Sequence, residues 1–582
     1  MASENLKQTI KDYENYIQAN GVDWRVVQAY AKACAVAING ENDIHYGLQL
    51  AKRSKELTER YCLEQTGGAI WELEKYAFEH KTTNKTILEL IDCFYSVLLL
   101  EAQHKVIDSF FRYIEHKREP KERFYMPRRK QLLKIGLVDA LQGMIDDRYD
   151  ILCISLIPGA GKTTIEKFFN AAVIGWYPKD FNLFYSHSGD ITRMYYDGIY
   201  DIVTNSDEYA WNDIFPDLYV TSTNAKTEQF NVGKYKPFPS VQCTSVGSKN
   251  AGKVRASKFL LVDDMIGGIE EALNPAILEK LWSKYSVDAR QRKIKDTDGK
   301  NCKEIHIATR WSVQDVIGRI QKMYEGNQRV KVIAVPDVDP VTGKSNFDYE
   351  FSGFDEEFFA DQQLLMDDIS YKCLYKQEPI EREGLLFPED KIRRYLNMPH
   401  GVPEIVTAQC DTKGKGTDYF VMPVFQKFGE DYYCVDAVCD NTADYEMQYE
   451  NAANMLVNNE VIECEFERNA GGDRVAMEVN KRVEAKGWIC NITDVPTETN
   501  KEARIFQCSN WILQHVIFKD ASKYTPKEPY GVMMTLLKQY SVSGKKQLDD
   551  VPDVFSNFAL RITQGNRTAK VEAVINPFRR FG

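Results

Sequence analysis

A glycine-rich loop between a largely apolar run and a helical pattern constrains the fold of this chain more than any other feature. Residues 151–157 form the apolar run, and residues 158–164 read Pro-Gly-Ala-Gly-Lys-Thr-Thr. Small residues let backbone N–H groups approach phosphate oxygens, and the start of a helix adds a favourable dipole. The segment therefore predicts a nucleotide site at the end of a strand. The residues expected to bind the nucleotide are Gly159, Gly161, Lys162 and Thr163.

Two side chains of this loop have specific expected roles. Lys162 is expected to reach the β- and γ-phosphates of ATP, and the hydroxyl of Thr163 is expected to ligate Mg²⁺. The position at which such loops usually have their first glycine is Leu156. Because a short Gly-Lys-Thr sequence also occurs in turns by chance, the interpretation depends on the strand before the loop and the helix after it.

A second element supports the nucleotide site. About a hundred residues downstream, the apolar run 259–262 ends in Asp263 and Asp264. A carboxylate at the end of a buried strand can hold Mg²⁺, so Asp263 is a predicted metal ligand. Asp264 is the predicted catalytic base that polarises the attacking water. Because many such ATPases have the longer Glu as this second acid, Glu270 and Glu271 remain alternatives for the base.

The chain is too long for one hydrophobic core, so two to four domains are expected. Residues 1–120 are expected to form a helical region, because apolar residues recur at helical spacing in 86–118. Residues 117–130 combine basic side chains with two prolines, which predicts a linker or hinge.

The remaining sequence predicts two further domains. Short apolar strands alternate with helices in residues 121–390, which predicts an α/β domain with a parallel sheet. A polar segment near several prolines predicts a linker over 391–402, and strands followed by helices predict a mixed α/β domain over 403–582. The expected strands cover 151–157, 182–186, 259–262, 304–308, 405–411, 420–425, 432–438 and 462–467.

Composition limits the classes of function. The net charge of −11 argues against a protein coated in basic residues for static DNA binding, but it allows an enzyme that moves along DNA. The 13 cysteines include no Cys-x-x-Cys pair, so we expect reduced thiols rather than structural zinc. The chain starts without an apolar signal segment, and the apolar run 93–100 is too short to span a bilayer. We therefore expect an intracellular protein without membrane contact.

Acidic residues gather at three places in residues 403–582. Asp411 and Glu467 each end an expected strand, and the sequence Asp-Asp-Val-Pro-Asp starts a late helix. Its second and third acids, Asp550 and Asp553, are three residues apart and can face one side of that helix. Carboxylates that converge in a fold need a partner, and two divalent ions about 4 Å apart can activate water for phosphodiester cleavage. The alternative interpretation is that each acid is simply solvated.

Several short segments, most of them beside an expected strand or domain end, occur together in one known family. They are Ala-Thr-Arg-Trp at 308–311, Asp315 with Gly318 and Arg319, Tyr-Ser-His-Ser at 185–188, Ile-Phe-Pro at 214–216, Gly-Lys-Val-Arg at 252–255 and Gln-Glu-Pro at 377–379. On these segments the chain resembles the large terminase subunits of tailed bacteriophages, over roughly residues 121–565.

The resemblance implies a P-loop ATPase domain followed by an RNase-H-like mixed α/β nuclease domain. In the ATPase it makes Thr309 the residue that couples hydrolysis to movement, with Arg310 as a candidate charge stabiliser. Some family members carry an arginine near the place of Pro158, so that charge would come from Arg255 or from a neighbouring subunit. Gln131 is the candidate for contact with adenine.

In the nuclease domain, the resemblance implies that Asp411, Glu467 and Asp553 are catalytic metal ligands. Asp550 is an added candidate ligand, and Asp418 is a second choice after the first strand. The expected cofactors are ATP with Mg²⁺ at the first site and Mg²⁺ or Mn²⁺ at the second.

The function implied by the resemblance is a viral DNA-packaging motor. ATP hydrolysis would drive DNA into a procapsid, and the endonuclease would cut concatemeric DNA. The expected partners are double-stranded DNA, the procapsid portal protein, the small terminase subunit and further copies of the chain in a ring. The expected location is the host cytoplasm, with transient binding to the procapsid. One alternative is a helicase-nuclease of DNA repair or recombination, and another is a scaffolding protein that hydrolyses no ATP.

Overall fold

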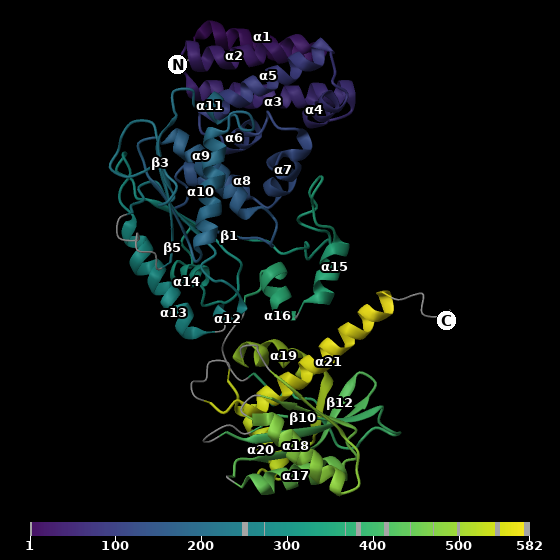
Figure 1. Ribbon diagram of the computed structural model, residues 1–582. Helices are drawn as coiled ribbons and strands as arrows, with labels where there is room; N and C mark the ends of the chain where they lie inside the picture. Colours follow the sequence, from purple (N-terminus) through teal and green to yellow (C-terminus); the bar gives the residue numbers. More distant parts are fainter. Residues whose placement is uncertain are drawn as a thin grey trace. The chain divides into compact units, whose positions relative to one another are not determined.

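The computed structural model divides the chain into two compact units, each described by itself (Figure 1). The first unit comprises Met1–Gly267, Ala276–Leu364 and Lys372–Pro379, and the second comprises Gly268–Pro275, Leu365–Tyr371 and Ile380–Gly582. The structure describes residues 3–246, 254–272, 274–366, 368–379, 386–412, 418–442, 444–468, 471–496, 501–541 and 547–575. Among these residues, no helix has the length and apolar character needed to cross a bilayer.

Helices form the N-terminal part of the first unit, as the sequence predicted. They are α1 (Glu4–Asn20), α2 (Trp24–Ala35), α3 (Ile44–Thr66), α4 (Ile70–Glu79), α5 (Lys85–Gln103) and α6 (Ile107–Ile114). Phe94, Val97 and Leu98 recur at helical spacing and are buried. The expected helical stretch 86–118 is two helices, because Lys105 takes a left-handed φ of 70° between them.

The basic segment 117–130 is not a linker. Its second half belongs to α7 (Tyr125–Lys134), and its arginines bind acids of the preceding helices. Arg123 Nη1 lies 2.6 Å from Glu74 Oε1, and Arg129 Nε lies 2.8 Å from Asp108 Oδ1. Because these pairs are largely buried, they fix the segment onto the helices before it, and the expectation of a hinge is wrong here.

The described part of the first unit contains an eight-stranded sheet with the order β3-β4-β5-β2-β6-β7-β1-β8. The strands from β5 to β8 in this order are parallel, and β3 and β4 join one edge as antiparallel strands. Every residue of β1, β2, β6 and β7 is buried, which explains their continuous apolar runs. The bounds are β1 (Ile151–Ser155), β2 (Asn182–Ser186), β3 (Val220–Asn224), β4 (Gln229–Val232), β5 (Val241–Ser245), β6 (Phe259–Asp263), β7 (Lys303–Ile307) and β8 (Val330–Ala334).

The order of this sheet places three predicted segments side by side. The strand β7 lies between β1 and β6, and all three are parallel. The phosphate loop, the acidic pair and Thr309 follow the carboxyl ends of these strands, so they meet at one edge of the sheet. The other helices before the second unit's sheet are α8 (Leu137–Ile145), α9 (Lys162–Trp176), α10 (Gly189–Thr204), α11 (Trp211–Ile214), α12 (Ile269–Ala272), α13 (Pro275–Ser283), α14 (Val316–Met323), α15 (Glu356–Leu365) and α16 (Asp368–Tyr371).

The described part of the second unit contains a seven-stranded mixed sheet with the order β14-β13-β10-β11-β12-β15-β9. Strands β10, β11 and β12 are antiparallel neighbours, and parallel strands extend the sheet on both sides. The bounds are β9 (Arg394–Tyr395), β10 (Ile405–Cys410), β11 (Phe420–Phe428), β12 (Asp431–Asp440), β13 (Glu463–Glu467), β14 (Asn491–Val495) and β15 (Val516–Lys519). Strand β9 pairs with β15, so part of the segment expected as a linker, 391–402, belongs to the sheet.

Both faces of this sheet are covered by helices. Side chains alternate along β11: Val421 and Phe425 pack in one core with α19 to α21, whereas Met422 and Val424 pack in the other with α17 and α18. The helices are α17 (Tyr445–Asn458), α18 (Gly472–Ala485), α19 (Lys501–His515), α20 (Pro529–Gln539) and α21 (Asp550–Ile575). The α/β class, the parallel-rich first sheet and the mixed second domain are therefore confirmed.

Candidate nucleotide and metal sites

The loop after β1 has the backbone that its sequence predicted. Gly159 and Gly161 have φ values of 79° and 88°, a left-handed conformation that favours glycine. At Gly161 a Cβ atom would also lie 2.3 Å from the ring of Phe124. Helix α9 begins at Lys162, directly after these glycines. The strand, loop and helix therefore have the arrangement that a phosphate site requires.

Lys162 is a buried cation without a carboxylate partner in the described part of the chain. Its Nζ donates to the carbonyl oxygens of Leu156, at 2.7 Å, and Ile157, at 3.3 Å. Burial lowers the pKa of Lys162. Burying an ammonium is costly unless an anion compensates it, so the site is suited to a bound phosphate.

Asp263 and Thr163 meet beside the loop and fit a Mg²⁺ site. Thr163 Oγ1 donates to Asp263 Oδ2 at 3.0 Å. Asp263 Oδ1 is buried and has no hydrogen-bond partner among the described residues. Burial, and then the neighbouring charge of Asp264, raises the pKa of Asp263 to about 7. A cation at this place would satisfy the unpaired oxygen and compensate the carboxylate charge.

Asp264 links the ends of β6 and β7. It has a left-handed φ of 34°, and its Oδ1 accepts a hydrogen bond from the backbone N–H of Thr309 at 3.0 Å. The predicted base and the predicted coupling residue are therefore bonded to each other. Glu270 and Glu271, the alternatives for the base, lie in α12, which belongs to the second unit.

Arg310, a candidate charge stabiliser, is held inside the first unit. Its Nε donates to Asp315 Oδ2 at 3.0 Å, and its Nη1 donates to Gln321 Oε1 at 2.7 Å. Asp315 also caps α14 by accepting the N–H of Gly318 at 2.7 Å. Arg310 therefore contributes to the start of this helix, and its donors already have partners.

Two other candidates from the sequence also make contacts within the chain. Arg255 Nη1 donates to the carbonyl oxygen of Val254 at 2.9 Å, and Gln131 Nε2 donates to that of Asp348 at 2.5 Å. Residues 252 and 253 of the family-like segment lie outside the described residues.

Sequence reasoning missed Glu166, which lies one turn after Lys162 on α9. Both of its carboxylate oxygens are buried without a hydrogen-bond partner in the described structure, as are Asn170 Oδ1 and Ser186 Oγ. Burial, and then the charge of Asp263, raises the pKa of Glu166 well above its usual range. The available signal was an acid placed four residues after the loop lysine in an otherwise largely apolar helix.

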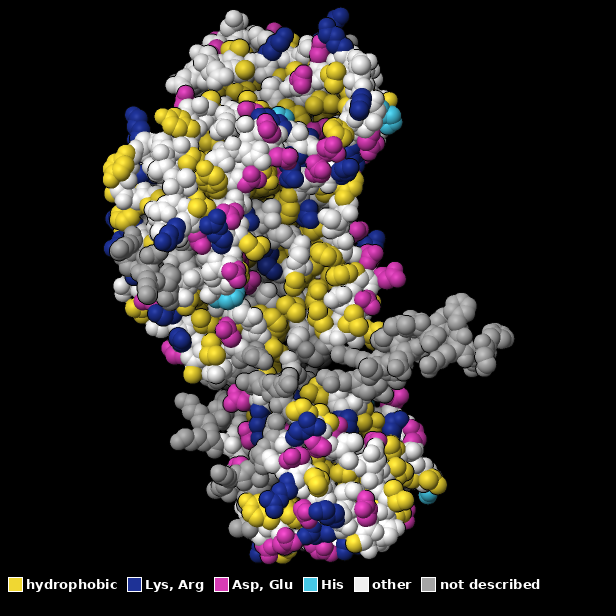
Figure 2. Space-filling view, in the orientation of Figure 1, with side chains coloured by type: hydrophobic (Ala, Val, Ile, Leu, Met, Phe, Trp, Pro, Cys, Tyr) yellow, Lys and Arg dark blue, Asp and Glu magenta, His cyan; other side chains and the backbone are white. Residues whose placement is uncertain are grey.

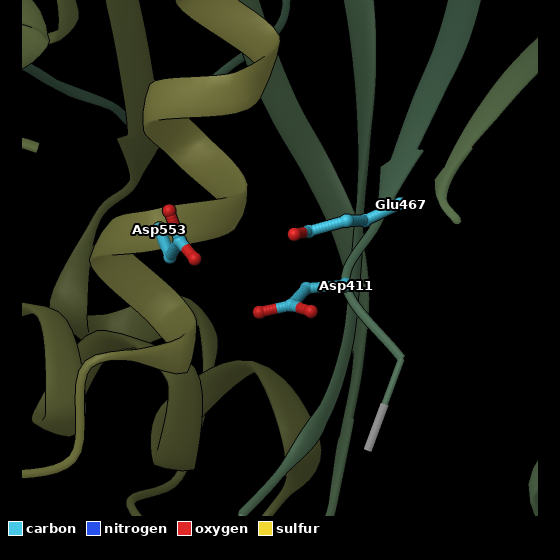
Figure 3. Close-up of side chains that lie close together, drawn as sticks. All are labelled: Asp411, Glu467 and Asp553. Atoms are coloured by element: carbon cyan, nitrogen blue, oxygen red, sulfur yellow. The ribbon is translucent and has the colours of Figure 1, made fainter. Parts of the chain in front are cut away.

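In the second unit, Asp411, Glu467 and Asp553 converge. One carboxylate oxygen of each lies within 4.8 Å of the others (Figure 3). Cys410 pairs with Phe466 in the parallel ladder, so the residues that follow them, Asp411 and Glu467, are neighbours. Asp553 faces them from the first turn of α21.

A tight turn after Glu467 holds one side of this carboxylate cluster. A Cβ atom on Gly472 would lie 1.8 Å from the carbonyl oxygen of Glu467, so the close approach requires glycine. Glu467 Oε2 accepts a hydrogen bond from Asn557 Nδ2 at 3.1 Å. The predicted turn therefore positions the carboxylate on the second strand.

The carboxylate of Asp411 fits a divalent metal ion. Asp411 is only 8% exposed, and its carboxylate makes no hydrogen bond or ion pair with any residue that the structure describes. Burial, and then the charge of Asp553, raises its pKa well above the usual range. A divalent cation would compensate this buried carboxylate and the two beside it.

Asp550 lies outside the carboxylate cluster formed by the described residues. Its Oδ2 accepts the backbone N–H of Tyr419 at 2.8 Å, and burial raises its pKa. The expectation that it faces the same point as Asp553 fails because this backbone contact holds it at the start of α21. Asp418 is partly exposed and adds to the negative potential at Asp550.

The sequence did not indicate the two cations beside Asp553. Lys501 Nζ lies 3.2 Å from Asp553 Oδ2, and Arg504 Nε donates to Asp553 Oδ1 at 3.1 Å. Both belong to α19, three residues apart and on one face of the helix. No local signal pairs them with an acid some fifty residues later, because only the fold brings α19 and α21 together.

The chain was also compared with known proteins. No family model and no curated protein matches it. Its structure is similar to the large terminase of bacteriophage HK97, with 10% identity over 80% of this chain and 99% of that chain and a TM-score of 0.35. For the ADP complex of the large terminase of a thermophilic bacteriophage, the values are 11%, 75%, 98% and 0.33. For the human cytomegalovirus terminase nuclease domain, Mn-soaked and inhibitor-bound, they are 10%, 30%, 95% and 0.25.

Proposed function

We propose that this chain is an ATPase and a metal-dependent DNA endonuclease that serves as the large subunit of a viral DNA-packaging motor. The observation that supports this function is that one chain carries two sites of complementary charge. One site presents a buried cation, Lys162, and the other presents a buried anion, Asp411, each without a counter-ion among the described residues. A phosphate ligand suits the first site, and a divalent metal suits the second.

At the first site, the residues have distinct roles toward ATP. Lys162 and the backbone of the loop would bind the phosphates, while Thr163 and Asp263 would hold Mg²⁺. Bound Mg²⁺ would neutralise phosphate charge. Asp264 would orient the attacking water, and its hydrogen bond with Thr309 provides a direct contact from the hydrolysis site to the end of β7.

At the second site, Asp411, Glu467 and Asp553 would hold Mg²⁺ or Mn²⁺. Bound metal would lower the pKa of a water molecule so that hydroxide is available at neutral pH. The protein's part is to fix the three carboxylates, through the strand ends on one side and through α21 on the other. Asn557 and Gly472 would act as positioning residues for Glu467.

The proposed partners are double-stranded DNA, a portal protein, a small terminase subunit and further copies of this chain in a ring. Lys and Arg side chains are interspersed with Asp and Glu on the face drawn in Figure 2. Such a surface suits weak, renewable contact with phosphates rather than a static DNA complex. The proposed place of action is the host cytoplasm and the procapsid.

Plasmid cleavage with Mn²⁺ and ATP hydrolysis, measured on the full chain and on Asp411→Ala, test this function. We expect the wild type to show both activities and the variant to lose cleavage alone. Stimulation of ATP turnover by a portal protein would support the packaging role over a repair helicase-nuclease. A wild-type protein that hydrolyses ATP but never cuts DNA would refute the nuclease assignment, and one without ATP turnover would refute the motor.

A further inference from the structure

Two positive side chains already occupy one side of the carboxylate cluster. Lys501 Nζ lies 2.8 Å from Asp549 Oδ1, 3.2 Å from Asp553 Oδ2 and 3.6 Å from Asp550 Oδ1. Arg504, which is 3% exposed, binds the other oxygen of Asp553 through its guanidinium group. Both oxygens of Asp553 therefore face a cation fixed on α19.

The other side of the cluster differs. Within the described residues, the carboxylate of Asp411 has no bonding partner, and the nearby ring of contacts around Glu467 includes the neutral amide of Asn557. The attraction for a divalent ion is therefore strongest between Asp411 and Glu467 and weakest near Asp553. An ion placed against Asp553 would have to displace Lys501 or lie close to its positive charge.

The spacing of the three carboxylates suits one ion. Mg²⁺ holds oxygen ligands at about 2.1 Å, so two oxygens on opposite sides of one ion are about 4.2 Å apart. The oxygens of Asp411, Glu467 and Asp553 lie within 4.8 Å of one another. Two ions about 4 Å apart would need ligands on both outer sides, and Asp553, the ligand on one of those sides, already binds two cations.

We propose that this centre binds one divalent cation, between Asp411 and Glu467, and that Lys501 supplies a second positive charge in place of a second ion. The inference rests on the proposed nuclease function and replaces the expectation of two ions. Lys501 is a positioning residue here: it holds Asp553 and excludes a second cation from it.

Mn²⁺ binding measured on the full chain by titration with electron paramagnetic resonance, without nucleotide, tests the number of ions. The reference is Asp411→Asn, so that only ions lost with Asp411 are counted. We expect the wild type to bind one more Mn²⁺ than this variant. Lys501→Ala should bind two more, because Asp553 is then free of one cation, whereas Lys501→Arg should still bind one more.

Lys538→Ala is a matched control, since Lys538 is about as exposed as Lys501 and binds Glu389 at 2.8 Å away from the cluster. It should leave the ion count at one. Two ions in the wild type would overturn the inference while leaving the nuclease function intact. One ion in a folded Lys501→Ala variant would also overturn it. If Asp411→Asn loses no Mn²⁺, the proposed nuclease centre itself is wrong.

Discussion

Asp263 is a buried carboxylate whose charge destabilises the folded protein. It is 2% exposed, and its hydrogen-bond partner among the described residues is the Thr163 hydroxyl. Burial, followed by the charge of Asp264, raises its pKa from 3.8 to about 7. The folded state then binds the proton more tightly than the unfolded chain, so stability falls as the pH rises from about 4 to 7. Above pH 7 the full penalty remains.

Asp263→Asn removes this charge, and its amide oxygen can still accept the hydrogen bond from Thr163. One pKa unit corresponds to about 1.4 kcal/mol, so the variant should be more stable by on the order of 4 kcal/mol at pH 8. For a unit of roughly 360 residues, this raises Tm by about 5 °C. At pH 5 the wild-type carboxyl is protonated in the folded state, and the gain should shrink to on the order of 2 kcal/mol.

Calorimetric melting at pH 8 and pH 5, without nucleotide or divalent metal, measures both values. Asp296→Asn is the control, because Asp296 is equally a buried acid but binds Lys258 Nζ at 2.7 Å. Although burial opposes it, that hydrogen bond lowers the pKa of Asp296, so this variant should lose stability at pH 8. A melting temperature of Asp263→Asn equal to that of the wild type, or a gain of the same size at both pH values, would refute the reasoning.

Three further substitutions test separate parts of the structure. Lys162→Ala should abolish ATP turnover and leave plasmid cleavage within about twofold, because the two sites belong to different units. Arg504→Ala should destabilise the protein by about 3–5 kcal/mol in urea unfolding, since it leaves the buried Asp553 with one cation fewer; a change below 1 kcal/mol would contradict this. Gly472→Ala should reduce cleavage on the order of a hundredfold, because the Cβ atom displaces the turn that holds Glu467. Gly189→Ala, with open space around its Cβ, should change neither activity.

The parts of the fold that the sequence predicted are those set by local pattern. Strand β2 has the bounds expected from its apolar run, and β6 and β10 differ from expectation by one residue, because each run ends at a polar side chain. The hairpin of β3 and β4 was not predicted, since β3 is exposed and polar and its pairing depends on the adjacent β5.

The candidate sites follow the same division. The loop glycines, Lys162 and Asp263 sit at ends of predicted strands, and the parallel order of the sheet brings these ends together. The late helix was expected from residue 554, but α21 starts at Asp550, because proline is accepted in the first turn of a helix. Lys501 and Arg504 could not be predicted, because their role depends on the packing of α19 against α21.

Both sites carry uncompensated charge, so each should gain stability from its own ligand alone. Lys162 needs an anion, and Asp411 needs a cation. A ligand at a hundred times its Kd stabilises the folded state by about 2.7 kcal/mol. ATP in the absence of divalent metal should therefore raise Tm in the wild type and in Asp411→Asn alike, but not in Lys162→Ala. Mn²⁺ without nucleotide should raise Tm in the wild type and in Lys162→Ala, and the rise should be largely lost in Asp411→Asn. An equal Mn²⁺ shift in Asp411→Asn and the wild type would show that the ion binds elsewhere, and the charge argument for the second site would then fail.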